Sequence, residues 1–181
     1  RDSADIDKNG TISNEKILQN GWSKPEGIRW SPDSKWLAYS MEDLTFNSEI
    51  YIQKADGSAK EVNISMHPRA DYSPVWSPDG SKLGFISARN NSNNDIWFVW
   101  LKKEDYQKTK QDWEEDDEEK PEEPKEETKK GKSKDKNKSK KEDEKPIQID
   151  LDLINERLVK LTDLSGNEGN IAILKDGMTF Y

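Results

Sequence analysis

Large apolar residues recur at every second position in several short stretches of the chain, with Gly, Pro, Asn and Asp between the stretches. Leu37 and Tyr39 form one such pair, and Ile50 and Ile52 form the next. A period of two places both members of a pair on one face of a β-strand. The pattern therefore predicts four short strands near residues 27–30, 36–40, 49–54 and 60–64.

The same pattern returns 46 positions further along, the separation of Trp30 from Trp76. The segment Trp30-Ser31-Pro32-Asp33 recurs as Trp76-Ser77-Pro78-Asp79, and Glu49-Ile50-Tyr51 recurs as Asp95-Ile96-Trp97. The repeat predicts a second set of strands near residues 73–76, 82–87, 95–101 and 157–162. A period of roughly 40–50 residues, built from strands and turns, is typical of the blades of a β-propeller.

Turn residues lie between the predicted strands. Ser-Pro-Asp-Gly at residues 77–80 supplies the turn between the first two strands of a repeat, and Asp56-Gly57 a hairpin between the last two. Residues 6–18, with Asn9-Gly10 as their turn, are predicted to form the last two strands of an earlier blade. Residues 169–181, with Asp176-Gly177, are predicted to form the first two strands of a later one.

The predicted fold class is therefore all-β, a partial β-propeller of four-stranded antiparallel blades. About two full blades and parts of two more are expected. Residues 1–21 end one blade, 22–67 and 68–162 form the two full blades, and 163–181 begin the next. The repeated Trp30 and Trp76 are predicted to pack in the core, because burying an indole removes roughly 150–250 Å² from water. An open run of blades exposes unpaired strand edges, so the isolated chain is expected to be marginally stable or to form homo-oligomers.

A strongly charged segment interrupts the second blade. Residues 102–145 contain 15 Lys and 17 Asp or Glu, and without them the chain has the charge content of an ordinary domain. Residues 112–127 are mostly acidic and residues 128–141 mostly Lys. With almost nothing apolar to bury, this insert is predicted to be disordered and to project from the same end as the Ser-Pro-Asp-Gly turn. Binding of nucleic acid is not expected, because no aromatic residues lie among the Lys to stack on bases.

Asp5-x-Asp7-x-Asn9-Gly10 resembles the start of an EF-hand calcium loop. The twelfth position of such a loop should be a bidentate carboxylate, but here it is Lys16, and Glu15 lies one position early. We therefore expect residues 5–16 to form a hairpin turn and not a metal site.

The sequence offers little other chemistry. His67 is the only histidine, it precedes Pro68, and no Gly-x-Ser-x-Gly elbow occurs. No phosphate-binding glycine loop, dinucleotide motif or Cys is present, and no apolar run approaches the roughly 20 residues of a membrane-spanning helix. We expect no catalytic, cofactor-binding or metal-binding residue in this segment.

The repeats resemble those of TolB-like, WD-like and tricorn-like propellers, and residues 146–157 narrow the resemblance. Ile149, Asp150, Ile154 and Arg157 are similar to a stretch that recurs in the tricorn-protease family just before an outer strand. A Lys/Glu-rich insert before this stretch is similar to bacterial members. Leu153 departs from the family pattern, in which a Gly is common at this position.

The resemblance implies a propeller that precedes a PDZ-like module and a serine-peptidase core, and that scaffolds the enzyme or channels peptides towards it. The expected partners are a peptide or protein and the rest of the parent chain, with no catalytic residue carried here. The residues do not fix the compartment, and the similarity to bacterial members implies an exported, periplasmic one. Two alternatives remain open: a TolB-like binding module without an enzyme, and the propeller of a prolyl-oligopeptidase-like hydrolase.

Overall fold

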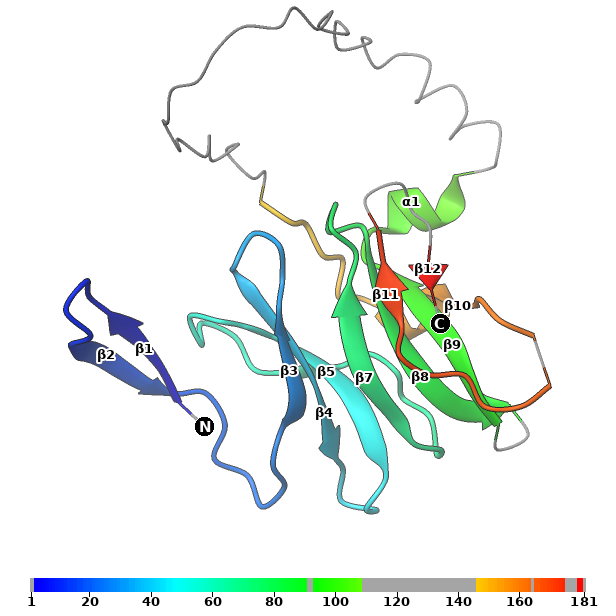
Figure 1. The fold of residues 1–181 in the computed structure, drawn as a ribbon, viewed down its shortest axis with the longest axis horizontal. Helices are drawn as coiled ribbons and strands as arrows, with labels where there is room; N and C mark the ends of the chain where they lie inside the picture. Colours follow the sequence, from blue (N-terminus) through cyan, green and yellow to red (C-terminus); the bar gives the residue numbers. More distant parts are fainter. Residues whose placement is uncertain (1, 91–92, 109–145, 164, 175–178, 181) are drawn as a thin grey trace, which may run out of the picture.

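The computed structural model describes residues 2–90, 93–108, 146–163, 165–174 and 179–180 (Figure 1). These residues form short antiparallel strands arranged as two four-stranded sheets, each next to a smaller hairpin. The all-β class and the four-stranded blades are thus confirmed. Most of the predicted disordered insert, residues 109–145, lies outside the described part of the chain.

The first sheet is built from four strands that follow each other in sequence and in space (Figure 1). They are β3 (Glu26–Trp30), β4 (Trp36–Glu42), β5 (Ser48–Lys54) and β6 (Val62–Asn63). Their order along the sheet is β3-β4-β5-β6, and every neighbouring pair is antiparallel.

The second sheet repeats this order 46 residues later. Its strands are β7 (Asp71–Trp76), β8 (Lys82–Asn90), β9 (Asn93–Trp100) and β10 (Leu158–Lys160). Trp76 pairs with Leu83 just as Trp30 pairs with Leu37 in the first sheet. The charged insert therefore separates the third and fourth strands without changing the topology.

One hairpin flanks each sheet. Strands β1 (Asp2–Ile6) and β2 (Ile12–Ile17) pair upstream, and β11 (Ala172–Ile173) and β12 (Thr179–Phe180) pair downstream. Both hairpins were predicted, although the predicted turn at residues 176–177 lies outside the described residues.

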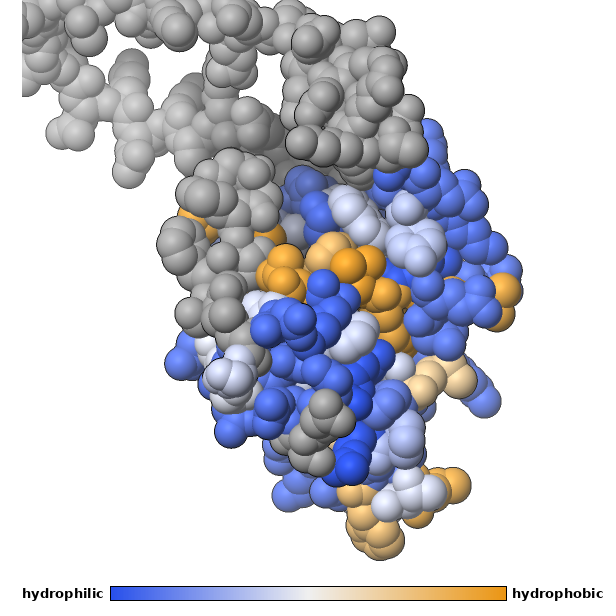
Figure 2. Space-filling model, turned by 90° about the vertical axis from the view of Figure 1, so that its right-hand side faces the viewer, coloured by the Kyte–Doolittle hydropathy of each residue, from blue (hydrophilic) through white to orange (hydrophobic). Residues whose placement is uncertain are grey.

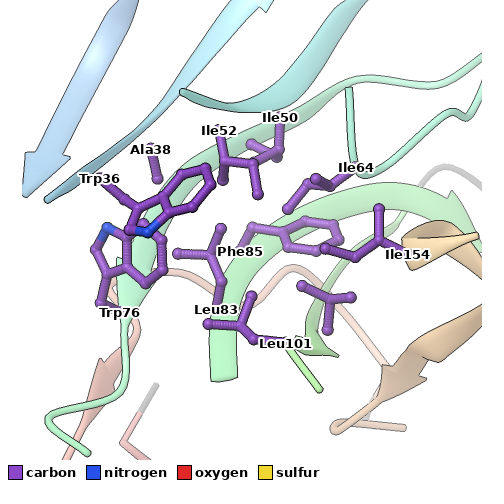
Figure 3. Close-up of a cluster of buried hydrophobic side chains, with 11 residues drawn as sticks. Trp36, Ala38, Ile50, Ile52, Ile64, Trp76, Leu83, Phe85, Leu101 and Ile154 are labelled. Carbon is purple, nitrogen blue, oxygen red and sulfur yellow. The ribbon is translucent and has the colours of Figure 1, made fainter. Parts of the chain in front are cut away.

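The main core lies between the two sheets (Figure 3). It joins side chains of β4 and β5 to those of β8 and β9, and adds Ile154 from the segment after the insert. The indoles of Trp36 and Trp76 lie next to each other in this cluster, with exposed fractions of 9% and 7%. The indole Nε1 of Trp76 donates to the backbone oxygen of Arg29 at 3.2 Å. This bond links β7 to β3, the first strand of each sheet, and these two edge strands are called the inner strands below.

The prediction that Trp30 also packs in the core is wrong, because 56% of this residue is exposed. Trp30 and Trp76 occupy equivalent positions, each on the face that looks towards the preceding sheet. Trp76 has the whole first sheet on that side, whereas the described part of the chain provides Trp30 only with the hairpin β1–β2. The second buried indole of the core is Trp36, whose place the repeat did not predict.

A second apolar cluster covers the other face of the second sheet. Ile86 and Ile96 pack against Ile171, with Tyr72, Val75 and Ile173 around them. Figure 2 looks onto this side of the molecule and shows apolar side chains gathered in its middle, bordered by hydrophilic ones. Each four-stranded sheet is thus covered on one face by the part of the chain that follows it: the first by the second sheet, and the second by Ile171 and Ile173.

The Ser-Pro-Asp turns have the same hydrogen bonds in both sheets. The Ser31 hydroxyl accepts from the Trp36 amide at 2.9 Å, and the Ser77 hydroxyl accepts from the Lys82 amide at 2.9 Å. The fourth turn residue has a positive φ in both, 57° at Ser34 and 68° at Gly80. A Cβ on Gly80 would lie 2.5 Å from Ile147, so glycine is required at that position.

The two flanks of the insert lie at the end that carries these turns (Figure 1). Ile147 donates its amide to Asp33 at 2.8 Å, and the Leu101 amide donates to the Ser81 oxygen at 3.0 Å. The predicted position of the insert is confirmed for these flanking residues. Its predicted start is wrong, because residues 103–107 form the helix α1 (Lys103–Gln107), whose Lys103 amide donates to Asp150.

The segment after the insert is held by a buried arginine. The η1 turn (Ile154–Arg157) precedes β10, and the Arg157 guanidinium donates to the backbone oxygens of Trp100, Leu101, Asp150 and Asp152. Burial lowers the pKa of Arg157 from its usual value, partly offset by the nearby carboxylates of Asp150 and Asp152. This contact gives a physical reason for the Ile-Asp to Arg stretch: it ties both flanks of the insert to the sheet.

Candidate functional site

The inner strands β3 and β7 carry the same irregularity. The register shifts between Glu26 and Arg29 in one strand and between Tyr72 and Val75 in the other. Gly27 and Ser73, again 46 positions apart, hold φ angles of 60° and 57° at these bulges. A bulge re-aims the side chains around it, so the inner edge of each sheet presents side chains that a regular strand would turn away.

A cleft of about 500 Å³ opens along this inner edge. Its walls come from β3, β7 and β8 and from the loop before β11. They consist of Arg29, Tyr72, Ser73, Val75, Ile86 and residues 168–171.

Hydrogen-bond donors and acceptors both line this cleft. The Arg29 guanidinium donates to the neighbouring Ile28 oxygen at 3.2 Å, and its side chain is exposed. Burial raises the pKa of the Tyr72 hydroxyl, which keeps this group protonated. The Glu168 carboxylate accepts from Thr162 at 3.3 Å. Such groups can form hydrogen bonds or ion pairs with the carbonyl, amide and carboxylate groups of a peptide.

A buried polar network joins the two sheets behind the cleft. Arg89 forms an ion pair with Asp71 at 2.8 Å and donates to the Ser65 oxygen at 3.3 Å. The Ser65 hydroxyl donates to the Glu49 carboxylate, and the Ser48 hydroxyl donates to the Asp71 oxygen at 2.9 Å. Ser48 and Glu49 belong to the first sheet, Ser65 to the loop that follows it, and Asp71 and Arg89 to the second sheet. The network therefore fixes the two sheets relative to each other.

Burial is the largest influence on the pKa of both acids of this network, Glu49 and Asp71. It raises the pKa of Glu49, although hydrogen bonds from Ser65, His67 and Asn47 act in the opposite direction. It also raises the pKa of Asp71 in spite of the Arg89 guanidinium. Arg89 lies over the rings of Trp97 and Phe85, 4.9 and 5.5 Å from the ring centroids.

Sequence reasoning missed this network. Part of the network has a signal in the repeat. The acidic residue before Ile50 in the first repeat, Glu49, recurs as Asp95 before Ile96 in the second. A hydroxyl residue also follows the fourth strand in both repeats. The Ile50 amide donates to Ser65 at 3.0 Å, and the Ile96 amide donates to Thr162 at 2.9 Å. The first repeat has no arginine at the position equivalent to Arg89, so the repeat could not have revealed the role of this residue.

The segment that resembles a calcium loop forms the turn of the β1–β2 hairpin, as expected. One oxygen of Asp7 accepts from the amides of Asn9 and Thr11, both at 2.8 Å, and these bonds lower its pKa. Asp5 accepts from the Asn14 side chain at 2.8 Å, and Lys16 donates to the Asp56 oxygen at 2.6 Å. Within the described ranges, no three His, Asp or Glu side chains lie close enough to form a metal cluster.

His67 lies in the loop between the two sheets. Its ring Nδ1 accepts from the Arg69 amide at 3.2 Å, and its own amide donates to Glu49. Partial burial lowers the pKa of His67. The Ser65 hydroxyl nearby also donates to Glu49. His67 therefore contacts the buried network through its backbone amide.

None of the helices in the described part of the chain is long and apolar enough to cross a membrane.

Comparison with known proteins adds the family relation. No protein-family model matches the chain. The chain is 34% identical over 61 residues to a tricorn protease homologue of Saccharolobus solfataricus, which is 34% of this chain and 6% of that protein. It is equally identical over 61 residues to a protein of Sulfurisphaera tokodaii that is provisionally named a tricorn-like protease C-terminal subunit, of which the match covers 7%.

The solved structure of a tricorn protease shares the fold. It matches 92% of this chain and 15% of its own chain, with a TM-score of 0.56 at 12% sequence identity. The chain contains a tricorn-like propeller region. The matches span only a small part of the length of each relative. In this tricorn-like region, β3 and β7 are the inner strands of two consecutive blades.

Proposed function

We propose that this tricorn-like region is the non-catalytic propeller portion of a serine peptidase, and that it scaffolds the enzyme and controls the access of peptides to it. The observation behind this proposal is the 34% sequence identity over 61 residues to a tricorn protease homologue. The cleft along the inner strands supports it, because Arg29 and Tyr72 there can contact a passing peptide. In this proposal neither residue takes part in bond cleavage.

The coding sequence beyond residue 181 provides the first test. We expect it to encode a PDZ-like module and a serine-peptidase core. A reading frame that ends once the propeller closes would favour a binding module without an enzyme. A downstream Gly-x-Ser-x-Gly elbow would instead favour a prolyl-oligopeptidase-like hydrolase.

The second test measures cleavage by the intact parent protein. Arg29→Glu reverses one charge in the cleft and should lower kcat/KM for a peptide of about 20 residues by about tenfold, with little change for a fluorogenic dipeptide. Lys60→Glu makes the same charge change at an exposed position outside the cleft and serves as the control. Equal effects of Arg29→Glu on both substrates would contradict a role in access.

A further inference from the structure

Exposed apolar side chains gather at the end of the molecule opposite the Ser-Pro-Asp turns. Trp22 lies in the loop before β3, and Leu44 and Phe46 lie in the turn between β4 and β5, at the lower end in Figure 1. Their exposed fractions are 55%, 85% and 76%. The rings of Trp22 and Phe46 meet edge to face, 5.3 Å apart. A group of exposed apolar side chains of this kind marks an interaction site more often than scattered ones do.

The turn that presents Phe46 is well fixed. One oxygen of Asp43 accepts from the Thr45 amide and hydroxyl, both at 2.7 Å, and from the Asn47 amide at 3.0 Å. Phe46 itself has a φ of 61°, in the left-handed region that a bulky side chain rarely adopts. The chain therefore holds an aromatic residue in a strained conformation without burying it, which is a frequent property of binding sites.

Two hollows flank the Trp22 ring. One has a volume of about 360 Å³ and the other about 260 Å³, and Trp22, Ser23, Met41 and Glu42 line both. The Ser23 hydroxyl accepts from the Glu42 amide at 3.1 Å, which joins the loop before β3 to the end of β4. Because these residues line both hollows, the two together are called the groove around Trp22.

The charge of the groove is negative. Glu26 and Glu42 line the first hollow, and Asp43 and Glu61 line the second together with Glu42. Lys24 is the one cationic side chain among the described residues that line them. Carboxylates around an aromatic centre favour a cationic partner, through ion pairs and cation–π contacts.

We propose that the groove around Trp22, together with the Phe46 ring that contacts this indole, binds an extended peptide segment in which bulky apolar side chains alternate with Lys or Arg. The apolar side chains contact the two rings and Leu44, and the cations pair with Glu26, Glu42 and Glu61. This surface is separate from the inner-strand cleft. The proposal needs no peptidase core, so it can fail or hold independently of the proposed function.

Fluorescence anisotropy of the full chain with three labelled probes tests this proposal. The first probe carries Lys-Leu-Lys-Phe-Lys between Gly/Ser flanks, the second has Glu for Lys, and the third has Ala for Leu and Phe. We expect the first to bind about tenfold more tightly than the others, and to lose affinity as NaCl is added. Equal binding of the three probes would overturn the proposal.

Trp22→Ala should weaken binding of the first probe by about tenfold. Trp30→Ala is the matched control, because Trp30 is exposed to the same extent, 56%, but lies at the other end of β3. It should change the affinity by no more than about twofold. Equal losses in the two variants would show that the groove is not the site.

Phe46→Gly separates binding from folding. Glycine adopts a positive φ readily, so the thermal midpoint should stay or rise while the affinity for the first probe falls. A variant that keeps full affinity would overturn the proposal. Replacing residues 109–145 by a Gly/Ser linker should leave the affinity unchanged, and a gain of about tenfold would show instead that the chain's own lysines occupy the groove.

Discussion

Several individual residues take backbone conformations that their side chains do not favour. Leu153 has a φ of 50° at the start of η1, at the position where the tricorn-like pattern often has a Gly. Leucine thus occupies a left-handed position that glycine would adopt more readily. A left-handed conformation costs a residue with a Cβ roughly 1–2 kcal/mol.

Leu153→Gly should therefore stabilise the chain, by about 0.5–1 kcal/mol once the greater freedom of glycine in the unfolded chain is subtracted. Leu153 is exposed, so little packing is lost. Urea unfolding measures the change. Leu161→Gly, at another exposed leucine with no positive φ, should destabilise the chain instead, and the same sign for both variants would contradict the explanation.

The acid Glu49 should make stability depend on pH. Burial raises its pKa above 4.5, so the folded chain keeps this proton at a pH where the unfolded chain has released it. The stability that this preference supplies is largest below pH 4.5 and is lost as the pH rises through the folded pKa. His67, whose pKa is lowered from 6.5, acts in the opposite direction.

Comparison of the wild type with Glu49→Gln isolates the contribution of Glu49. Asp71 and His67 titrate in both proteins, so the difference between their unfolding free energies should change with pH above 4.5. The wild type should lose stability with rising pH relative to the variant, as measured by urea unfolding up to about pH 7.5. Parallel pH profiles would show that Glu49 does not titrate differently in the folded chain.

At the scale of elements, the sequence predicts most strands to within a few residues, because period-two patterns and the repeated turns act locally. Residues 103–107 were missed because their composition matches the charged insert, whereas the Lys103 amide is fixed by the distant Asp150. The exposure of Trp30 could not be read from the repeat. It depends on which sheet covers each face, and that is not encoded in the local pattern.

The candidate site was not predicted from the sequence, unlike the strands. The inner-strand bulges have a weak signal in Gly27, but Ser73 at the equivalent position hides it. The network of Glu49, Asp71 and Arg89 joins residues from both sheets, and their approach follows from the packing of the sheets.

The flanks of the insert, and not its charged centre, should matter for stability. Replacing residues 109–145 with about ten Gly and Ser residues should change the unfolding free energy by only about 1 kcal/mol, the difference in loop-closure entropy. Arg157→Gln should cost about 2–3 kcal/mol, because several backbone oxygens lose a charged donor. A large loss on shortening, or none for Arg157→Gln, would contradict this assignment.

At the scale of the whole molecule, one sheet occurs twice and the two copies pack face to face. The core between them takes Trp36 from the first sheet and Trp76 from the second. Arg89, which forms an ion pair with Asp71, also donates to the Ser65 oxygen in the loop after the first sheet. The solved structure of a tricorn protease shares the fold over 92% of the chain. Positions that are equivalent in the repeat can therefore differ in energy, because the sheet that covers one of them does not cover the other.

Parallel urea unfolding of Trp76→Ala and Trp30→Ala tests this central claim most directly. Trp76 is buried between the sheets, and its removal should cost about 3–5 kcal/mol, whereas the exposed Trp30 should cost less than about 1 kcal/mol. Similar costs for the two variants, or a larger cost for Trp30→Ala, would contradict the packing of the first sheet onto the Trp76 face of the second.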